Sequence, residues 1–255
     1  MSLKIKLETK HPIAYESLDY KNPHGTKANN SKNIIFNRKI NKIYNNNSIN
    51  ILDLGCSGGG FVKDCIDDGH IAVGLEGSDY SKKHSRAEWR TIPNFLFTCD
   101  ITKPFTILQE DVKMKFHLIT AWEVMEHIEE KDFPELMNNV KNHLYDNGLC
   151  IFSISLVDDI INGVNLHRTV KNKKWWYEMF KSHNFFILDG FKNYFNEQYI
   201  RGKKYGAPNT FHVILSLNKD KAPLIPKLTM RQKIADYIIG TRFQRMVKNF
   251  VLGEY

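Results

Sequence analysis

From residue 49 onward, short apolar runs alternate with amphipathic stretches along the chain. The apolar runs predict seven strands, which are Asn50–Leu54, Ile71–Leu75, Phe95–Cys99, Phe116–Ala121, Gly148–Ser155, Phe185–Leu188 and Phe211–Leu217. The stretches with helical periodicity predict helices at Gly59–Asp68, Ser81–Glu88, Phe133–Tyr145 and Lys174–Ser182. Such alternation is typical of βαβ units. We therefore expect an α/β fold with a doubly wound, mostly parallel seven-stranded sheet, whose last strand returns antiparallel after the polar stretch Asn193–Asn209.

The two ends of the chain differ from this middle part, residues 49–219. Residues 1–48 are polar and turn-rich, so we expect an arm or a lid, with His24-Gly25-Thr26 as a lid candidate. Residues 220–255 combine apolar positions with Lys and Arg, which predicts a basic amphipathic helical tail. This tail would pack on its own domain, join two copies in a homodimer, or bind a membrane surface or a partner protein. No apolar run is long enough to span a membrane and the start does not look like a signal peptide, so we expect a cytoplasmic protein.

Charge and cysteine content narrow the function classes. The net charge is +8, but residues 51–220 hold 20 Lys and Arg against 23 Asp and Glu, and the excess of basic residues lies at the two ends. A nucleic-acid enzyme ordinarily places basic residues beside its active site, so this distribution disfavours a nucleic-acid substrate. The four cysteines are Cys56, Cys65, Cys99 and Cys150, without the spacing of a zinc site or a disulfide scaffold, and we expect them reduced and buried.

A glycine-rich turn follows the first predicted strand in Ile51–Phe61. A dinucleotide fingerprint would need a glycine where Ser57 stands, and a P-loop would need Gly-Lys-Ser/Thr, so both are disfavoured. Glu76 ends the second strand, where a carboxylate accepts hydrogen bonds from ribose hydroxyls, and Asp100 follows the third. Together with Asp53, they place three carboxylates at one sheet edge, which suits a ligand with an amine and hydroxyls and no phosphate.

This combination resembles the class I S-adenosylmethionine-dependent methyltransferases over about residues 49–217. The resemblance implies S-adenosylmethionine as cofactor. It assigns the methionine part to Asp53 and the turn that contains Gly55, Cys56, Ser57 and Gly59, the ribose to Glu76, and the adenine to Asp100 with Ile101. Gly77, Ser78 and Trp122 are further expected cofactor contacts. Ser57 departs from the glycine that is usual at its position.

The segment after the fourth strand carries candidate chemistry in Ala121-Trp-Glu-Val-Met-Glu-His-Ile128. On a helix, Glu123, Glu126 and His127 would project from one face. Two carboxylates and an imidazole suit Mg²⁺, Mn²⁺ or a similar ion, with His167 as a fourth ligand after the fifth strand. The Glu-x-x-Glu-His motif resembles that of metal-dependent O-methyltransferases. The alternative is that Glu126 and His127 only orient the cofactor loop.

These residues lead to an expected reaction and substrate class. Either His127 or His167 would be the catalytic base that accepts the proton of a substrate hydroxyl. We expect an O-methyltransferase that acts on a small hydroxylated molecule, a sugar or a nucleotide-linked sugar, with a divalent metal assisting if one is bound. The alternatives are an RNA 2′-O-methyltransferase and a cofactor-binding module that acts through its tail on a partner or a membrane.

Overall fold

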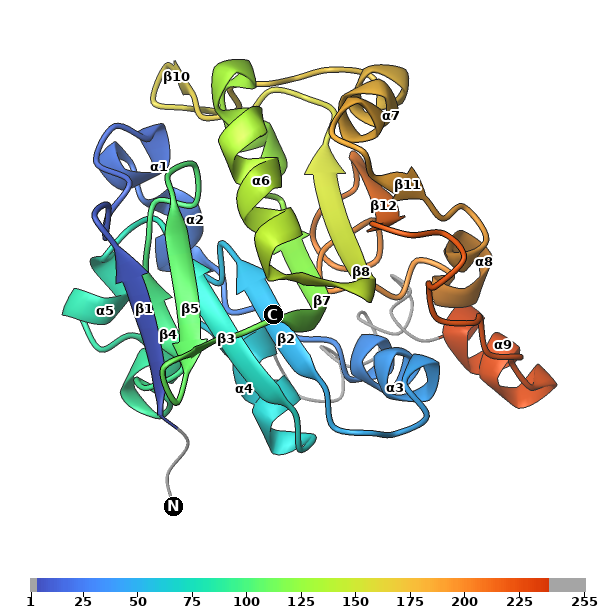
Figure 1. Cartoon of the computed structure of the whole chain (residues 1–255). Coiled ribbons are helices and arrows are strands. Elements are labelled where there is room, and N and C mark those ends of the chain that lie inside the picture. Colours follow the sequence, from blue (N-terminus) through green and yellow to red (C-terminus); the bar gives the residue numbers. More distant parts are fainter. Residues whose placement is uncertain (1–3, 239–255) are drawn as a thin grey trace, which may run out of the picture.

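A seven-stranded mixed sheet forms the centre of the molecule in the computed structural model, which describes residues 4–238 (Figure 1). Its strand order is β11 (Phe186–Ile187), β12 (Thr210–Ser216), β8 (Leu144–Ser155), β7 (Phe116–Trp122), β2 (Asn50–Leu54), β3 (Ile71–Glu76) and β4 (Leu96–Thr98). The five strands from β8 to β4 are parallel, and β12 is antiparallel to both of its neighbours. The predicted fold class and the antiparallel last strand are therefore confirmed.

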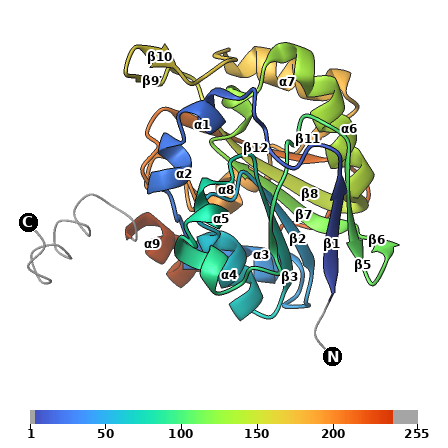
Figure 2. The same ribbon diagram turned by 90° about the vertical axis from the view of Figure 1, so that its left-hand side faces the viewer.

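Helices cover both faces of this sheet (Figures 1 and 2). One core contains residues of α6 (Phe133–His143) and α7 (Lys173–Ser182), and the other contains residues of α3 (Ile34–Ile43), α4 (Gly60–Asp67) and α8 (Phe191–Phe195). Successive strand residues point to opposite faces, so in β8 the residues Cys150 and Phe152 join the first core and Leu149 and Ile151 join the second. A sheet buried on both sides explains why the predicted strands are continuous apolar runs rather than alternating ones.

The first part of the chain is more structured than its composition indicated. It contains β1 (Ile5–Thr9), α1 (Leu18–Lys21), α2 (His24–Ala28) and α3. β1 pairs antiparallel with β5 (Phe105–Gln109), which pairs with the short β6 (Val112–Lys113), and this second sheet was not predicted. Ile5 and Ile107 of these strands join the core under α6.

Two of the predicted elements need correction. The helix expected at Ser81–Glu88 is instead a short α5 (Tyr80–Lys83) followed by a 3-10 turn at Ala87–Arg90. Ser85 and Ala87 have positive φ angles, which turn the chain back so that the Trp89 indole donates a hydrogen bond to the Ser57 carbonyl at 2.7 Å. The helix expected to reach Tyr145 ends at His143, and β8 begins at once with Leu144, which pairs with Phe116.

The remaining elements lie at the surface. A hairpin of β9 (Ile160–Ile161) and β10 (Val164–Asn165) follows β8, and α9 (Met230–Ile238) is the last helix among residues 4–238. Within that part of the chain, no helix is long and apolar enough to cross a membrane. The four cysteines are buried, as predicted.

Candidate active site

A cavity of about 900 Å³ opens at the edge of the sheet where the parallel strands have their carboxyl ends. The residues that follow β2, β3, β4, β7 and β8 line one side of it, and residues between Ala14 and Asn29 line the other. Ligands bind at this edge in open α/β sheets, because the loops there carry most of the exposed backbone and polar groups. The cavity is therefore the candidate active site.

The glycine-rich turn forms the floor of the cavity next to β2. Gly55 has a φ of +73°, and an added Cβ would lie 2.4 Å from the Val124 Cγ2 atom. Its amide and that of Cys56 both donate to the Leu75 carbonyl, at 2.8 and 3.0 Å, which fixes the turn against β3. The turn therefore needs a glycine at position 55 for both its backbone angle and its space.

Glu76 is buried at the end of β3 and faces this turn. Its carboxylate accepts hydrogen bonds from the Ser57 amide at 2.8 Å, the Ser78 amide at 3.1 Å and the Thr26 hydroxyl at 3.2 Å. Burial raises the pKa of Glu76 above its usual value, although these three donors favour the charged form. The sequence pointed to Glu76 and Ser57, but Thr26 belongs to α2, and its contact with Glu76 was not predicted.

Residues 14–29 lie over the cofactor side of the cavity and contact it at several points. The Ser57 hydroxyl donates to the Asn29 carbonyl at 2.8 Å, and the Ala14 amide donates to the Gly77 carbonyl at 2.9 Å. His24, Gly25 and Thr26, the residues of the lid candidate, all line the cavity. Whether this segment opens and closes stays a prediction.

The structure brings most, though not all, of the expected cofactor residues to the cavity. Its lining includes Gly55, Ser57, Glu76, Gly77, Ser78, Asp100, Ile101 and Trp122. Asp53, Cys56 and Gly59 do not line it. Asp53 is buried below the turn, where it accepts a hydrogen bond from the Thr120 hydroxyl at 2.7 Å, and burial raises its pKa to about 7. Asp53 therefore supports the turn from beneath.

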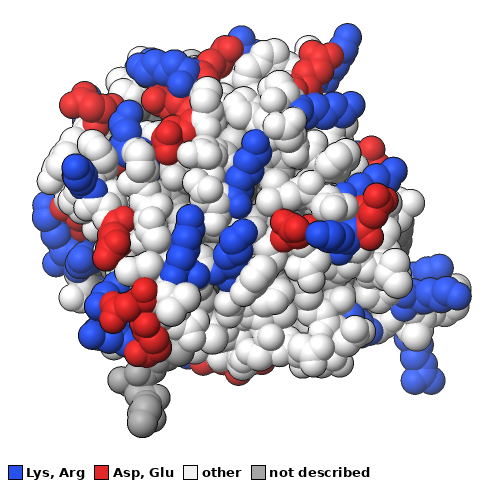
Figure 3. Space-filling view, in the orientation of Figure 1, with Lys and Arg blue, Asp and Glu red and all other residues white. Residues whose placement is uncertain are grey.

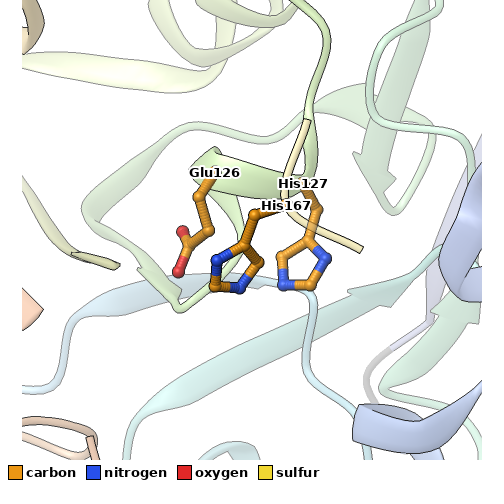
Figure 4. A group of neighbouring side chains, drawn as sticks. All are labelled: Glu126, His127 and His167. Carbon is orange, nitrogen blue, oxygen red and sulfur yellow. The ribbon is translucent and has the colours of Figure 1, made fainter. Parts of the chain in front are cut away.

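The second group of expected residues meets beside the same cavity, on the segments that follow β7 and β10. Figure 4 shows Glu126, His127 and His167 side by side, and we call these three residues the Glu-His-His cluster. One potential ligand atom from each lies within 4.8 Å of the other two. Glu126 is fully buried, and one of its oxygens accepts from the Ser155 amide at 2.9 Å, while the other has no hydrogen-bond partner among residues 4–238. Burial, with a smaller contribution from Glu123, raises the pKa of Glu126 to about 8.

The two histidines of this cluster differ in charge. The His127 Nδ1 atom lies 2.9 Å from the Asp19 carboxylate of α1. Burial opposes a charge on His127, but the carboxylates of Asp19 and Glu126 outweigh it and raise its pKa to about 9. Burial lowers the pKa of His167, whose Nδ1 donates to the Val157 carbonyl at 2.5 Å. At neutral pH, His127 is therefore an imidazolium, and His167 is neutral, with a lone pair on Nε2 that accepts no hydrogen bond within the described part of the chain.

Glu123 does not share a helix face with Glu126 and His127, contrary to the sequence prediction. Its φ is +58°, and only Met125–His127 form a single 3-10 turn after it. The Glu123 carboxylate lines the cavity and accepts a hydrogen bond from the Thr210 hydroxyl of β12 at 2.6 Å. The sequence spacing placed Glu123 on the wrong element, because the chain turns sharply at the end of β7.

Comparisons with known proteins agree with this geometry. The methyltransferase domain family matches residues 29–199. A S-adenosylmethionine-dependent methyltransferase from Clostridium acetobutylicum has 16% identity, covers 73% of this chain and 92% of its own, and gives a TM-score of 0.52. The 1,6-didemethyltoxoflavin-N1-methyltransferase of Burkholderia thailandensis was solved with bound 1,6-didemethyltoxoflavin and S-adenosylhomocysteine. It has 11% sequence identity, the match covers 79% of this chain and 84% of that one, and the TM-score is 0.53. A TehB-like methyltransferase from Corynebacterium glutamicum has 15% sequence identity, with 77% of this chain and 94% of that one covered, and a TM-score of 0.51. No protein with curated annotation matches the chain in sequence.

The fold and the cavity together define a class I methyltransferase, an enzyme that uses S-adenosylmethionine. The chain belongs to the methyltransferase domain family, whose match covers about two thirds of it. The residues present fit the cofactor: a glycine turn without room for a side chain at position 55, next to a buried carboxylate at the end of β3. Gly55, Ser57 and Glu76 are the residues that would hold it.

Proposed function

We propose that this methyltransferase transfers the methyl group to a hydroxyl of a small polyol, a sugar or a similar molecule. The observation that carries this proposal is the neutral His167, whose free Nε2 lies at the cavity beside the charged His127. A hydroxyl is a weak nucleophile at neutral pH, so an enzyme that methylates it needs a proton acceptor close to the reacting oxygen. An amine acceptor with a free lone pair needs no such group, which favours oxygen as the methylated atom.

The two histidines have complementary roles in this proposal. S-adenosylmethionine supplies an electrophilic methyl on its sulfonium. The His167 Nε2 atom accepts the hydroxyl proton, and the His127 imidazolium stabilises the negative charge that develops on the oxygen. The ring centroids of the two histidines are 4.7 Å apart, so one substrate oxygen can contact both. Asp19 holds His127 in its charged form, and Glu126 supports the cluster from the buried side.

The size and charge of the cavity support a small, uncharged substrate. A volume of about 900 Å³ accommodates the cofactor and one further small molecule. Nine Asp or Glu residues line the cavity against five Lys or Arg residues. This excess of acidic groups repels phosphates, so it favours a plain sugar over a nucleotide-linked sugar and argues against RNA.

A divalent ion is a second candidate for the same cluster. The unpartnered Glu126 oxygen and the two imidazoles are ligands that Mn²⁺ or a similar ion accepts. Two ligands of one ion lie at most about 4.2 Å apart when each bond is about 2.1 Å, so the cluster would have to tighten slightly. His127 would also have to lose one proton, so that Nε2 could bind the ion while the Nδ1–H group keeps its contact with Asp19. A bound ion would lower the pKa of the substrate hydroxyl directly.

The test is methyl transfer to a panel of sugars, polyols, amines and RNA by the wild-type chain and by His167→Gln. We expect wild-type transfer to a polyol, and a loss of at least about 100-fold in kcat for His167→Gln, the lower range of general-base catalysis. The affinity for S-adenosylmethionine, measured by calorimetry, should stay within about twofold, because His167 is not among the residues that would hold the cofactor. His84→Gln, a change of a histidine that does not line the cavity, is the matched control.

Other outcomes separate the alternatives. Full activity of His167→Gln, or transfer to amines alone, would overturn the proposal. Labelled RNA, with substrate binding that weakens steeply as salt rises, would establish the nucleic-acid alternative instead. Loss of transfer on adding a chelator, restored by Mn²⁺ or Mg²⁺, would assign the cluster to a metal.

A further inference from the structure

The helix α9 packs against the domain with its polar side. Asp236 is only 4% exposed, and its carboxylate lies 2.5 Å from the Lys39 ammonium of α3, which is equally buried. The Lys39 ammonium also donates to the Tyr194 carbonyl at 2.7 Å, and the Gln198 amide donates to the Asp236 carbonyl at 3.0 Å. Polar contacts and one buried ion pair therefore hold this helix in place.

The apolar side of α9 consequently faces away from the domain. Met230, Ile234 and Ile238 lie at i, i+4 and i+8, which places them on one helix face, and each residue is more than half exposed. Leu224 and Ile225, just before the helix, are also exposed. A surface helix of a globular protein normally shows the opposite arrangement, with its apolar face toward the core. Contiguous exposed apolar groups of this kind mark an interaction surface.

Cations flank this apolar stripe. Arg231 and Lys233 are exposed on either side of it, and Lys227 is exposed shortly before the helix. In Figure 3 basic side chains gather on the projection at the position that α9 has in Figure 1. The only acidic residue of α9 is Asp236, which is neutralised by Lys39. The exposed part of α9 is therefore apolar in the middle and positive at its edges.

We propose that this face of α9, the stripe Met230-Ile234-Ile238 with Arg231 and Lys233, docks on an anionic lipid surface. An apolar face bordered by cations matches a membrane interface, where the apolar side chains enter the acyl region and the cations contact lipid phosphates. A second copy of the chain is a poorer match, because it would bring the same cations to the interface, and α9 has no exposed carboxylate to pair with them. Residues 239–255, which lie outside the described residues, are also a poorer match for this face. They carry Arg242, Arg245 and Lys248, which would be repelled by Arg231 and Lys233.

The test is co-sedimentation of the full chain with vesicles of phosphatidylcholine alone and of an equal mixture of phosphatidylcholine and phosphatidylglycerol. We expect binding to the anionic vesicles, weakened by salt, and little binding to the neutral ones. The variant Arg231→Gln with Lys233→Gln should bind about 25-fold more weakly, since each cation near an anionic surface contributes about 1 kcal/mol, a factor of about five. The triple variant Met230→Gln, Ile234→Gln, Ile238→Gln should bind at least about tenfold more weakly.

Controls keep the result specific to α9. The variant Ile34→Gln with Val112→Gln removes two equally exposed apolar side chains elsewhere and should bind like the wild type. Unchanged melting temperatures would show that the α9 variants fold. The proposal is overturned if anionic vesicles are not bound, or if the α9 variants bind as well as the wild type. It is also overturned if sedimentation velocity shows a dimer that only the triple variant abolishes, because the stripe would then join two copies.

Discussion

Single residues decide whether the glycine turn can keep its backbone shape and its packing. Gly55 and Gly69 both have positive φ angles, +73° and +91°, which cost a side-chain-bearing residue about 1 kcal/mol or more. They differ in their surroundings: a Cβ at position 55 would lie 2.4 Å from Val124, while one at position 69 would meet no atom of the described residues within 4 Å. The pair therefore separates the effect of backbone strain from that of a steric clash.

We expect Gly55→Ala to lower the affinity for S-adenosylmethionine by more than about tenfold and Gly69→Ala to leave that affinity unchanged. Backbone strain alone should lower the free energy of unfolding by a similar amount in both variants. The clash at position 55 would push Val124, and with it the segment that leads to Glu126 and His127. Calorimetric titration and thermal unfolding of both variants measure the two effects. Equal cofactor affinity in the two variants would mean that the turn tolerates a side chain.

At the scale of elements, the buried ion pair between α3 and α9 offers a contrast with an exposed one. Removing one partner of a buried pair leaves an uncompensated charge and costs about 3 to 5 kcal/mol. We expect Asp236→Ala to release α9 from the domain rather than unfold the sheet, because the Lys39 ammonium can regain water only when the helix moves away. Hydrogen exchange of the α9 amides should rise, while that of β2 and β7 stays slow.

Two variants test this interpretation. Asp146→Ala breaks the pair with Lys221, whose side chains are 65% and 57% exposed, and it should change stability by less than about 1 kcal/mol. Lys39→Met combined with Asp236→Leu replaces the pair by apolar groups and should restore slow exchange in α9. Protected α9 amides in Asp236→Ala alone would show that other contacts hold the helix.

At the scale of the whole molecule, several buried groups bind protons more tightly in the folded state than in the unfolded chain. Burial raises the pKa of Asp53 to about 7 and that of Glu126 to about 8, and Asp19 with Glu126 raises that of His127 to about 9. Unfolded Asp and Glu titrate near pH 4 and unfolded His near 6.5. Between about pH 7 and pH 8 the folded state therefore holds more protons, so stability must fall as pH rises.

We expect the melting temperature of the ligand-free protein to fall between about pH 7 and pH 8. Burial lowers the pKa values of five other histidines, which act in the opposite direction: His70, His117, His143, His167 and His212. An unfolded His with a pKa near 6.5 is already mostly neutral at pH 7, so these groups weaken the fall in stability without reversing it. Glu126→Gln removes one of the contributing groups and should give a shallower fall. A melting temperature that rises with pH, or an equal slope in Glu126→Gln, would contradict these protonation states.

The central sheet could be predicted from the sequence alone, and so could the position of the glycine turn and of Glu76 at one edge of it. Runs of buried residues such as those of β2 and β8 are long enough to be read as strands, and local turn chemistry fixes Gly55 and Glu76 at strand ends. The family match and the strand order agree with that prediction. These features depend on residues that are close together in the chain, so local pattern is enough to find them.

The contacts between distant segments could not be predicted from the sequence. The pairing of β1 with β5, the hydrogen bond from Thr26 to Glu76 and the ion pair of Asp19 with His127 each join residues about 50 to 110 positions apart. No periodicity in the sequence encodes them, because polar residues of an exposed segment and of one folded over a cavity have the same composition. The charges of His127 and His167 depend on these contacts and on burial, which is why the sequence left the choice of base open.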